Sequence, residues 1–137
     1  MKKYGHKINY YETDKMGITH HSNYVRIMEE ARIDFLDQLG WSFIKLENEG
    51  IASPVTSIEC TFKKPTTFPD LVEVLVTVEK LSALKLTFNY EFSVRDEVVF
   101  TAKSTHCFID ENGRPVFIEK KYPDFYADLK KCAGEIK

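Results

Sequence analysis

Cysteine is scarce in this sequence, and its few cysteines stand far apart. The chain contains Cys60, Cys107 and Cys132, and no two of them form a CxxC pair. An odd number of widely spaced cysteines argues against a disulfide framework and against a zinc site, because both require paired or clustered thiols. Cys60 and Cys107 fall in alternating, strand-like segments, so we expect them to be ordinary sheet or core residues.

Long hydrophobic runs and blocks of one charge are also missing. No apolar run approaches the roughly 20 residues that a membrane-spanning helix needs. The lysines at positions 2 and 3 are not followed by the apolar segment of a signal peptide. The formal net charge is -2 without any basic block, which argues against nucleic acid as a partner. The cytoplasm is therefore the predicted location.

What is present is the composition of one ordinary globular domain. Hydrophobic residues make up 43% of the chain and charged residues 29%, the usual proportions of such a domain. A chain of 137 residues can bury one sizeable core and leaves little room for a second. With no internal repeat and no low-complexity linker, we predict a single domain over residues 1–137.

Helical periodicity marks one long segment near the N-terminus. Apolar residues recur at helical spacing from about Asn23 to Leu39, and Gly40 is a strong stop signal. The apolar stripe covers well over a third of the circumference, so other structure should largely enclose this helix. A strand is predicted before it, over residues 4–11, and a short second helix after it, over residues 42–48. The residues that widen the stripe are Val25, Ile33 and Leu36.

From Ala52 onward the pattern changes to the period of two that is typical of strands. Strands are predicted up to Pro65 and over residues 72–78, 86–94 and 98–109, with a turn at 111–114 and a closing amphipathic helix at 123–132. The connections are too short for parallel crossovers, so the strands should pair antiparallel. The economical arrangement is an α+β fold in which one curved antiparallel sheet wraps around one long central helix.

The connection between the first strand and the long helix collects an unusual number of polar groups, and it reads YETDKMGITHHSNY. Gly17 allows a backbone conformation that a side chain would disfavour, and Ser22 and Asn23 are favoured N-cap residues. The free N–H groups and the positive dipole at the start of a helix can bind an anion or a developing oxyanion.

Asp14 lies on the loop that must fold back toward this helix start. A carboxylate beside preorganised N–H donors is a candidate nucleophile or general base for acyl transfer. On spacing alone, Asp14 and Gly17 could equally well form an ordinary turn, since both residue types are common in turns. The residues therefore leave a turn and an active site as open alternatives.

The motif from Tyr10 or Tyr11 through Tyr24 closely resembles the signature of the 4-hydroxybenzoyl-CoA thioesterase family, whose members are hotdog-fold acyl-CoA thioesterases. The bacterial Tol-Pal-associated branch is the most similar. The resemblance covers essentially the whole chain, from Lys3 to about Tyr126, and includes the helix, its Gly40 stop and the following strands in the expected order. It implies the hotdog fold.

The resemblance also assigns roles to residues of the motif. The family's catalytic aspartate matches Asp14, and its glycine matches Gly17. The residue whose backbone N–H polarises the thioester carbonyl matches His21. Asn23 and Tyr24, at the end of the motif, are the implied substrate-binding residues. Lys15 and Met16 stand where some relatives carry small residues or proline, so the shape of the loop is not implied.

Other polar residues are weaker candidates. The side chains of His20 and His21 should point apart, and no third ligand is suitably spaced, so no metal site is predicted. His106 alternates within a strand and is expected to be a packed histidine. In a second branch of hotdog thioesterases the catalytic acid is a glutamate on the long helix, which makes Glu29 or Glu30 the alternative to Asp14. We expect these two instead to lie on a solvated helix face.

The predicted function is hydrolysis of an acyl-CoA thioester to a carboxylic acid and free coenzyme A, without a metal or redox cofactor. Two alternatives stay open: a non-catalytic acyl-CoA-binding hotdog protein, and a thioesterase that acts on acyl carrier protein. The acyl group is not determined. Cations for the phosphates of coenzyme A could come from several positions near strand ends. These positions are Lys63, Lys64, Lys85 and Arg95.

A homo-oligomer, either a dimer or a tetramer, is the expected assembly. A single sheet leaves an edge strand and an outer face exposed, and related proteins pair their sheets edge to edge. Leu75, Val99 and Ile109 are apolar residues on the polar faces of their strands, which suggests a second buried surface.

Overall fold

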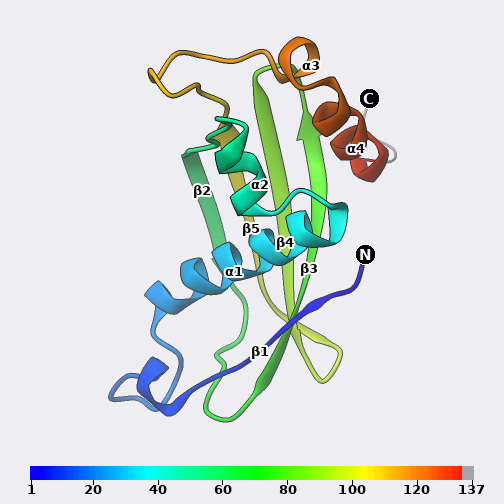
Figure 1. The fold of residues 1–137 in the computed structure, drawn as a ribbon. Coiled ribbons are helices and arrows are strands. Elements are labelled where there is room, and N and C mark those ends of the chain that lie inside the picture. Colours follow the sequence, from blue (N-terminus) through cyan, green and yellow to red (C-terminus); the bar gives the residue numbers. More distant parts are fainter. Residues whose placement is uncertain (134–137) are drawn as a thin grey trace.

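A computed structural model describes residues 1–133 of the chain, so the last four residues of the predicted domain lie outside the described part. Five strands form one antiparallel sheet in the order β1-β3-β4-β5-β2, and helix α1 lies across one face of it (Figure 1). The predicted α+β architecture is confirmed. The strands are β1 (Tyr4–Lys7), β2 (Val55–Phe62), β3 (Leu71–Leu81), β4 (Lys85–Val94) and β5 (Glu97–Cys107). The helices are η1 (Tyr10–Glu12), α1 (His21–Leu39), α2 (Phe43–Asn48), α3 (Ile118–Lys121) and α4 (Pro123–Ala133).

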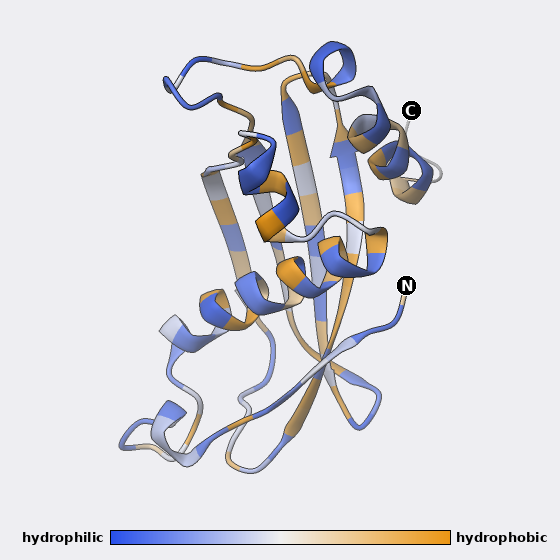
Figure 2. Cartoon of the chain, in the orientation of Figure 1, coloured by the Kyte–Doolittle hydropathy of each residue, from blue (hydrophilic) through white to orange (hydrophobic). Residues whose placement is uncertain are grey.

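The core lies between helix α1 and the sheet. Tyr24 and Phe35 of α1 pack against aromatic rings of the strands, with ring centroids 4.6 Å apart for Tyr24 and Phe100 and 5.5 Å for Phe35 and Phe88. Hydrophobic bands recur along α1 and along the strands, as alternation toward a shared core requires (Figure 2). Gly40 ends α1 in the left-handed conformation, with φ of 93°, as predicted.

Two predicted features of the N-terminal part were wrong. The strand expected over residues 4–11 ends at Lys7, and the chain then forms the short 3-10 helix η1. Its turn is closed by the Glu12 N–H, which donates to the Asn9 carbonyl at 2.9 Å. Helix α1 is also less enclosed than its apolar stripe suggested, because Val25 is 41% exposed and Ile33 is only half-buried.

The remaining connections follow local turn chemistry. The β4–β5 turn places Arg95 and Asp96 at positive φ, as a tight two-residue hairpin requires. Ser42 caps α2 by accepting from the Lys45 N–H, and α4 closes the chain by packing against β3. Within residues 1–133, no helix is both long and apolar enough to cross a membrane.

Candidate active site

The loop between η1 and α1 is a compact turn built around Asp14 and Gly17. The Asp14 N–H donates to the Ile18 carbonyl and the Gly17 N–H donates to the Asp14 carbonyl, both at 2.9 Å. Gly17 has a φ of 79°, a conformation that side chains disfavour. The Met16 N–H donates to Oδ1 of Asp14 at 2.8 Å, whereas Oδ2 has no hydrogen bond within residues 1–133. Asp14 therefore closes a turn and still keeps one carboxylate oxygen available.

Threonines from the β2–β3 connection attach this loop to the rest of the protein. The Thr19 N–H donates to the Thr66 carbonyl at 2.8 Å, and the Thr66 hydroxyl donates to the Thr19 hydroxyl at 2.7 Å. The Thr67 hydroxyl donates to the Gly17 carbonyl at 2.7 Å. Because Thr19 and Thr66 are buried, the bonds between these two residues are shielded from water and hold the loop in one position.

The start of helix α1 differs from the prediction, because the N-cap is His20 rather than Ser22 or Asn23. His20 has extended backbone angles, and its Nδ1 accepts from the Ser22 N–H at 3.2 Å. The rings of His20 and His21 stack with centroids 4.2 Å apart, so the expectation that they point apart was also wrong. Asn23 cannot act as the cap, since its side chain turns inward and donates to the Glu12 carbonyl at 2.9 Å.

The helix start leaves one backbone donor unused. The Asn23 N–H donates to the His20 carbonyl and the Ser22 N–H donates to the His20 ring. The His21 N–H makes no hydrogen bond to any described residue. An unpaired N–H at the positive end of a helix of 19 residues is suited to hold a carbonyl oxygen as negative charge develops on it.

Asp14 and His21 line the same hollow, which has a volume of about 370 Å³. One wall comes from the loop and the helix start, and the other from the end of β2 and the residues after it. Tyr24 forms part of the wall, with its hydroxyl 3.0 Å from that of Thr66. Gly17 and Asn23 do not line the hollow; they shape the loop and tie the helix to it. The lining residues are Asp14, Met16, Ile18, Thr19, His21, Tyr24, Phe62, Lys63, Lys64 and Pro65.

Only some of the candidate cations belong to this hollow. Lys63 and Lys64 line it, and Lys64 also forms an ion pair with Glu97. Lys85 lies at the start of β4, outside the hollow. Arg95 lies in the β4–β5 turn, and its guanidinium is 3.7 Å from the carboxylate of Asp70. Lys63, together with Lys64 in its ion pair with Glu97, gives this wall a positive charge, which suits an anionic substrate.

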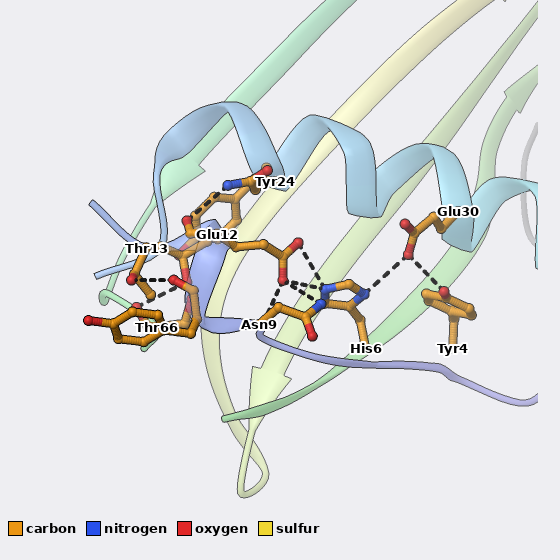
Figure 3. A network of polar contacts seen from close by, with 11 residues as sticks. Tyr4, His6, Asn9, Glu12, Thr13, Tyr24, Glu30 and Thr66 are labelled. Atoms are coloured by element: carbon orange, nitrogen blue, oxygen red, sulfur yellow. Dashed lines mark hydrogen bonds and ion pairs between the residues drawn. The ribbon is translucent and has the colours of Figure 1, made fainter. Parts of the chain in front are cut away.

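A second polar cluster joins His6, Asn9, Glu12 and Glu30, none of which lines the hollow (Figure 3). Glu12 is buried, and its carboxylate accepts from the Asn9 N–H at 2.7 Å and faces Nε2 of His6 at 2.9 Å. Burial raises the pKa of Glu12, but the hydrogen bonds from Asn9 and His6 outweigh it, so the pKa lies below its ordinary value. Glu12 is therefore held as a carboxylate two residues before Asp14.

The helix glutamates do not reach the hollow. The side chain of Glu29 is 66% exposed and lies 4.0 Å from Arg32, whereas Glu30 accepts from the Tyr4 hydroxyl at 2.8 Å. Together with burial, the Glu30 carboxylate raises the pKa of Tyr4 to about 12. Both glutamates lie on the expected solvated face, since the Glu30 side chain is also 45% exposed, and Glu30 in addition belongs to the cluster around His6.

His106 is a packed core histidine, as predicted from its strand position. It is 1% exposed, with Nε2 at 2.8 Å from the Ser104 hydroxyl and Nδ1 at 3.1 Å from the Ser53 carbonyl. Burial lowers its pKa to about 4, a shift that the bond to the Ser53 carbonyl opposes. Within residues 1–133, no three His, Cys, Asp or Glu side chains come together in a way that could hold a metal ion.

The sequence motif did not identify the residues that complete the site from outside it. Phe62 and Pro65 form the far wall, and Thr66 and Thr67 hold the loop. These residues are close in space only because β2 leads back past the start of α1. No spacing rule connects positions that far apart in the chain, so only a tertiary structure could find them.

Comparison with known proteins places the chain among thioesterases. The family described as Thioesterase-like superfamily matches residues 8–131. A protein of Aquifex aeolicus named "Putative esterase" is 37% identical over 125 residues, which cover 91% of this chain and 97% of the relative. A Bacillus subtilis protein named "Putative acyl-CoA thioesterase YneP" is 31% identical over 128 residues, which cover 92% of this chain and 93% of the relative.

A solved structure agrees with these relatives. The DHNA-CoA thioesterase from Staphylococcus aureus superimposes with a TM-score of 0.90 at 32% sequence identity, and the match covers 95% of this chain and 89% of that protein. The family match includes helix α1 and strands β2 to β5, and with the structural match it confirms the predicted hotdog fold.

Proposed function

We propose that this chain, which belongs to the thioesterase-like superfamily and is a thioester hydrolase, cleaves acyl-CoA with Asp14 as its catalytic carboxylate. The observation that carries the proposal is that Asp14 and the unpaired N–H of His21 belong to one hollow. Within the superfamily, the motif from Tyr11 to Tyr24 favours the 4-hydroxybenzoyl-CoA thioesterases and their Tol-Pal-associated branch, while the relatives named above carry other names.

In the proposed reaction, the thioester carbonyl lies between the two groups. Its oxygen accepts from the His21 N–H, which stabilises the negative charge that develops when the carbon is attacked. Oδ2 of Asp14 either attacks the carbon, forming a mixed anhydride that water then hydrolyses, or removes a proton from an attacking water. In both routes the C–S bond breaks, the thiolate of coenzyme A leaves and takes up a proton, and a carboxylic acid forms.

The remaining parts of the hollow fit the rest of such a substrate. Lys63 and Lys64 supply positive charge for the phosphates of coenzyme A, and the same charge suits an acidic acyl carrier protein. Tyr24 and Phe62 give an apolar wall for an acyl group. A carboxylate and a backbone donor supply the proposed chemistry, so the proposed reaction needs no metal or redox cofactor. The cytoplasm is the proposed location of the protein.

A panel of thioesters tests the substrate class. We expect the purified protein to release free thiol from at least one acyl-CoA, and to do so equally well in the presence of a chelator. The panel includes straight-chain acyl-CoA esters of several lengths, 4-hydroxybenzoyl-CoA and, because of the Staphylococcus aureus relative, 1,4-dihydroxy-2-naphthoyl-CoA. Faster release from matched acyl carrier protein thioesters would transfer the assignment to that partner, and a chelator-sensitive rate would contradict the proposed chemistry.

We also propose that the protein is a homo-oligomer, a dimer or a tetramer, paired through β2. Among the described residues this strand pairs with β5 only, so its outer edge presents backbone groups that none of them pairs. Ile58 and Phe62 on β2 are 40% and 52% exposed, and Phe62 also lines the hollow. Val99 gives no support, because it is already buried within the single chain at 4% exposure.

The assembly can be measured by multi-angle light scattering at micromolar concentration, where we expect at least twice the mass of one chain. Ile58→Lys, which places a charge on the exposed face of β2, should shift the protein toward the monomer. A monomeric wild-type protein at this concentration would contradict the pairing.

A further inference from the structure

His6 lies between two carboxylates that come from different elements. Its Nε2 is 2.9 Å from Oε1 of Glu12 on η1, and its Nδ1 is 3.2 Å from Oε1 of Glu30 on α1 (Figure 3). The side chains of His6 and Glu12 are 13% and 8% exposed, so water screens their contact little. The ring thus bridges the 3-10 helix to a point in the third turn of α1.

The protonation state of the His6 ring decides whether its contacts with Glu12 and Glu30 are both attractive. A neutral imidazole donates from one nitrogen only, and the lone pair of the other would then face a carboxylate oxygen. The protonated ring donates from both nitrogens and carries the charge that two carboxylates favour. On its own strand, the Tyr4 hydroxyl donates to the same Glu30 oxygen, Asp34 adds further negative charge nearby on α1, and the cross-strand neighbour Val72 adds no charge.

Glu12 connects this bridge to the proposed catalytic groups. Its carbonyl accepts from the His20 N–H at 2.8 Å and from the Asn23 side chain at 2.9 Å. On one side, then, Glu12 is bonded to the residue that precedes His21, and on the other it lies two residues before Asp14. Any movement of Glu12 changes how the Asp14 carboxylate and the His21 N–H are placed relative to each other.

We propose that His6 is a positioning residue of the thioesterase site. Its protonated ring holds Glu12 against α1 and thereby fixes the position of the Asp14 carboxylate relative to the His21 N–H. This inference rests on the proposed function for its effect on turnover. His6 does not line the hollow, so it acts through Glu12 and does not touch the substrate. A substitution that removes one of the two contacts of the ring should loosen Glu12 and lower turnover.

The test compares the kinetics of wild type with those of His6→Gln. We expect His6→Gln to lower kcat about tenfold or more with KM changed less than about twofold, the pattern of misplaced catalytic groups. Thermal unfolding of both proteins checks that the variant is folded under the assay conditions. A wild-type kcat in folded His6→Gln, or a KM that changes as much as kcat, would overturn the proposal.

Two neighbouring helix residues provide matched variants. Glu30→Gln removes one of the two carboxylates that contact the ring and should lower kcat by less than about tenfold, with KM changed less than about twofold. Glu29→Gln, one residue away and directed to solvent, should leave kcat and KM unchanged. Equal effects from the two substitutions would contradict a specific role for the His6 bridge.

A measurement without turnover separates this inference from the proposed function. In the absence of substrate, His6→Gln should shift the amide resonances of both Asp14 and His21, whereas Glu29→Gln should leave them in place. The shift at His21 should also appear when His6→Gln is introduced into Asp14→Asn, even if Asp14 proves not to be catalytic. Amide resonances of Asp14 and His21 that stay at their wild-type positions in His6→Gln would overturn the positioning role, whatever the substrate.

Discussion

Asp14→Asn is expected to lower turnover of a good acyl-CoA substrate at least about a hundredfold, the scale of a lost nucleophile or base. The substitution is mild in shape, because the oxygen of the introduced side-chain amide can still accept from the Met16 N–H, which in wild type donates to Oδ1 of Asp14 at 2.8 Å. The loop should therefore keep its turn, and only the charge and reactivity of the second oxygen are lost. Steady-state thiol release gives kcat, and a competition assay gives binding.

Binding provides the internal control for this variant. Coenzyme A or a non-hydrolysable analogue should bind within a few-fold of wild type, because the lysine-lined wall and the His21 N–H are unchanged. Asp37→Asn, at an exposed aspartate on α1, is the matched control and should have wild-type activity. Near wild-type hydrolysis by Asp14→Asn would make the assignment wrong. A wild type that binds acyl-CoA but hydrolyses none in a broad panel would support the binding protein instead.

Acidification should destabilise the folded protein through His106. Burial lowers the pKa of His106 to about 4, so between the ordinary pKa and this value the unfolded chain binds a proton that the folded chain does not. This difference in proton binding costs the folded protein no stability above the ordinary pKa of about 6.5, and the stability is lost as the pH falls from there toward 4. The unfolding free energy should decrease by about 3 kcal/mol over this interval, as measured by urea denaturation at several pH values.

His106→Gln isolates this contribution from that of the carboxylates. Glutamine can keep a polar contact with Ser104 but does not titrate, so the variant should be less stable at pH 7 and should lose most of the slope between pH 6.5 and 4. His6, His20 and His21 are unchanged in the variant. A slope in His106→Gln equal to that of wild type would show that other groups cause the acid sensitivity.

The sequence by itself determined the elements whose cause is local. The extent of α1 follows from its apolar spacing and from Gly40, which tolerates the left-handed backbone at its end. The strands follow from their alternation, and their short connections require antiparallel pairing. The turn at Asp14 and Gly17 is local in the same sense, because the hydrogen bonds that close it join residues at most four positions apart, and only its attachment to Thr67 is long-range.

Local signals could also mislead where a distant partner competes. Ser22 and Asn23 have the chemistry of N-caps, but Asn23 gains a buried bond to the Glu12 carbonyl, and the ring of His20 takes the capping role. The first strand ends early for a similar reason. The Glu12 side chain accepts from the Asn9 N–H and from His6, and this favours the 3-10 turn over a longer extended segment.

Only the tertiary structure decided what surrounds Asp14. The antiparallel register of β2 on β5 brings Phe62 and the lysines after it to the helix start, and it sets Thr66 against Thr19, 47 residues away. The bridge from Glu12 through His6 to Glu30 depends equally on where β1 lies beside α1. Such contacts depend on strand pairing and core packing between distant segments, and neither periodicity nor residue type along the chain encodes which of these segments meet.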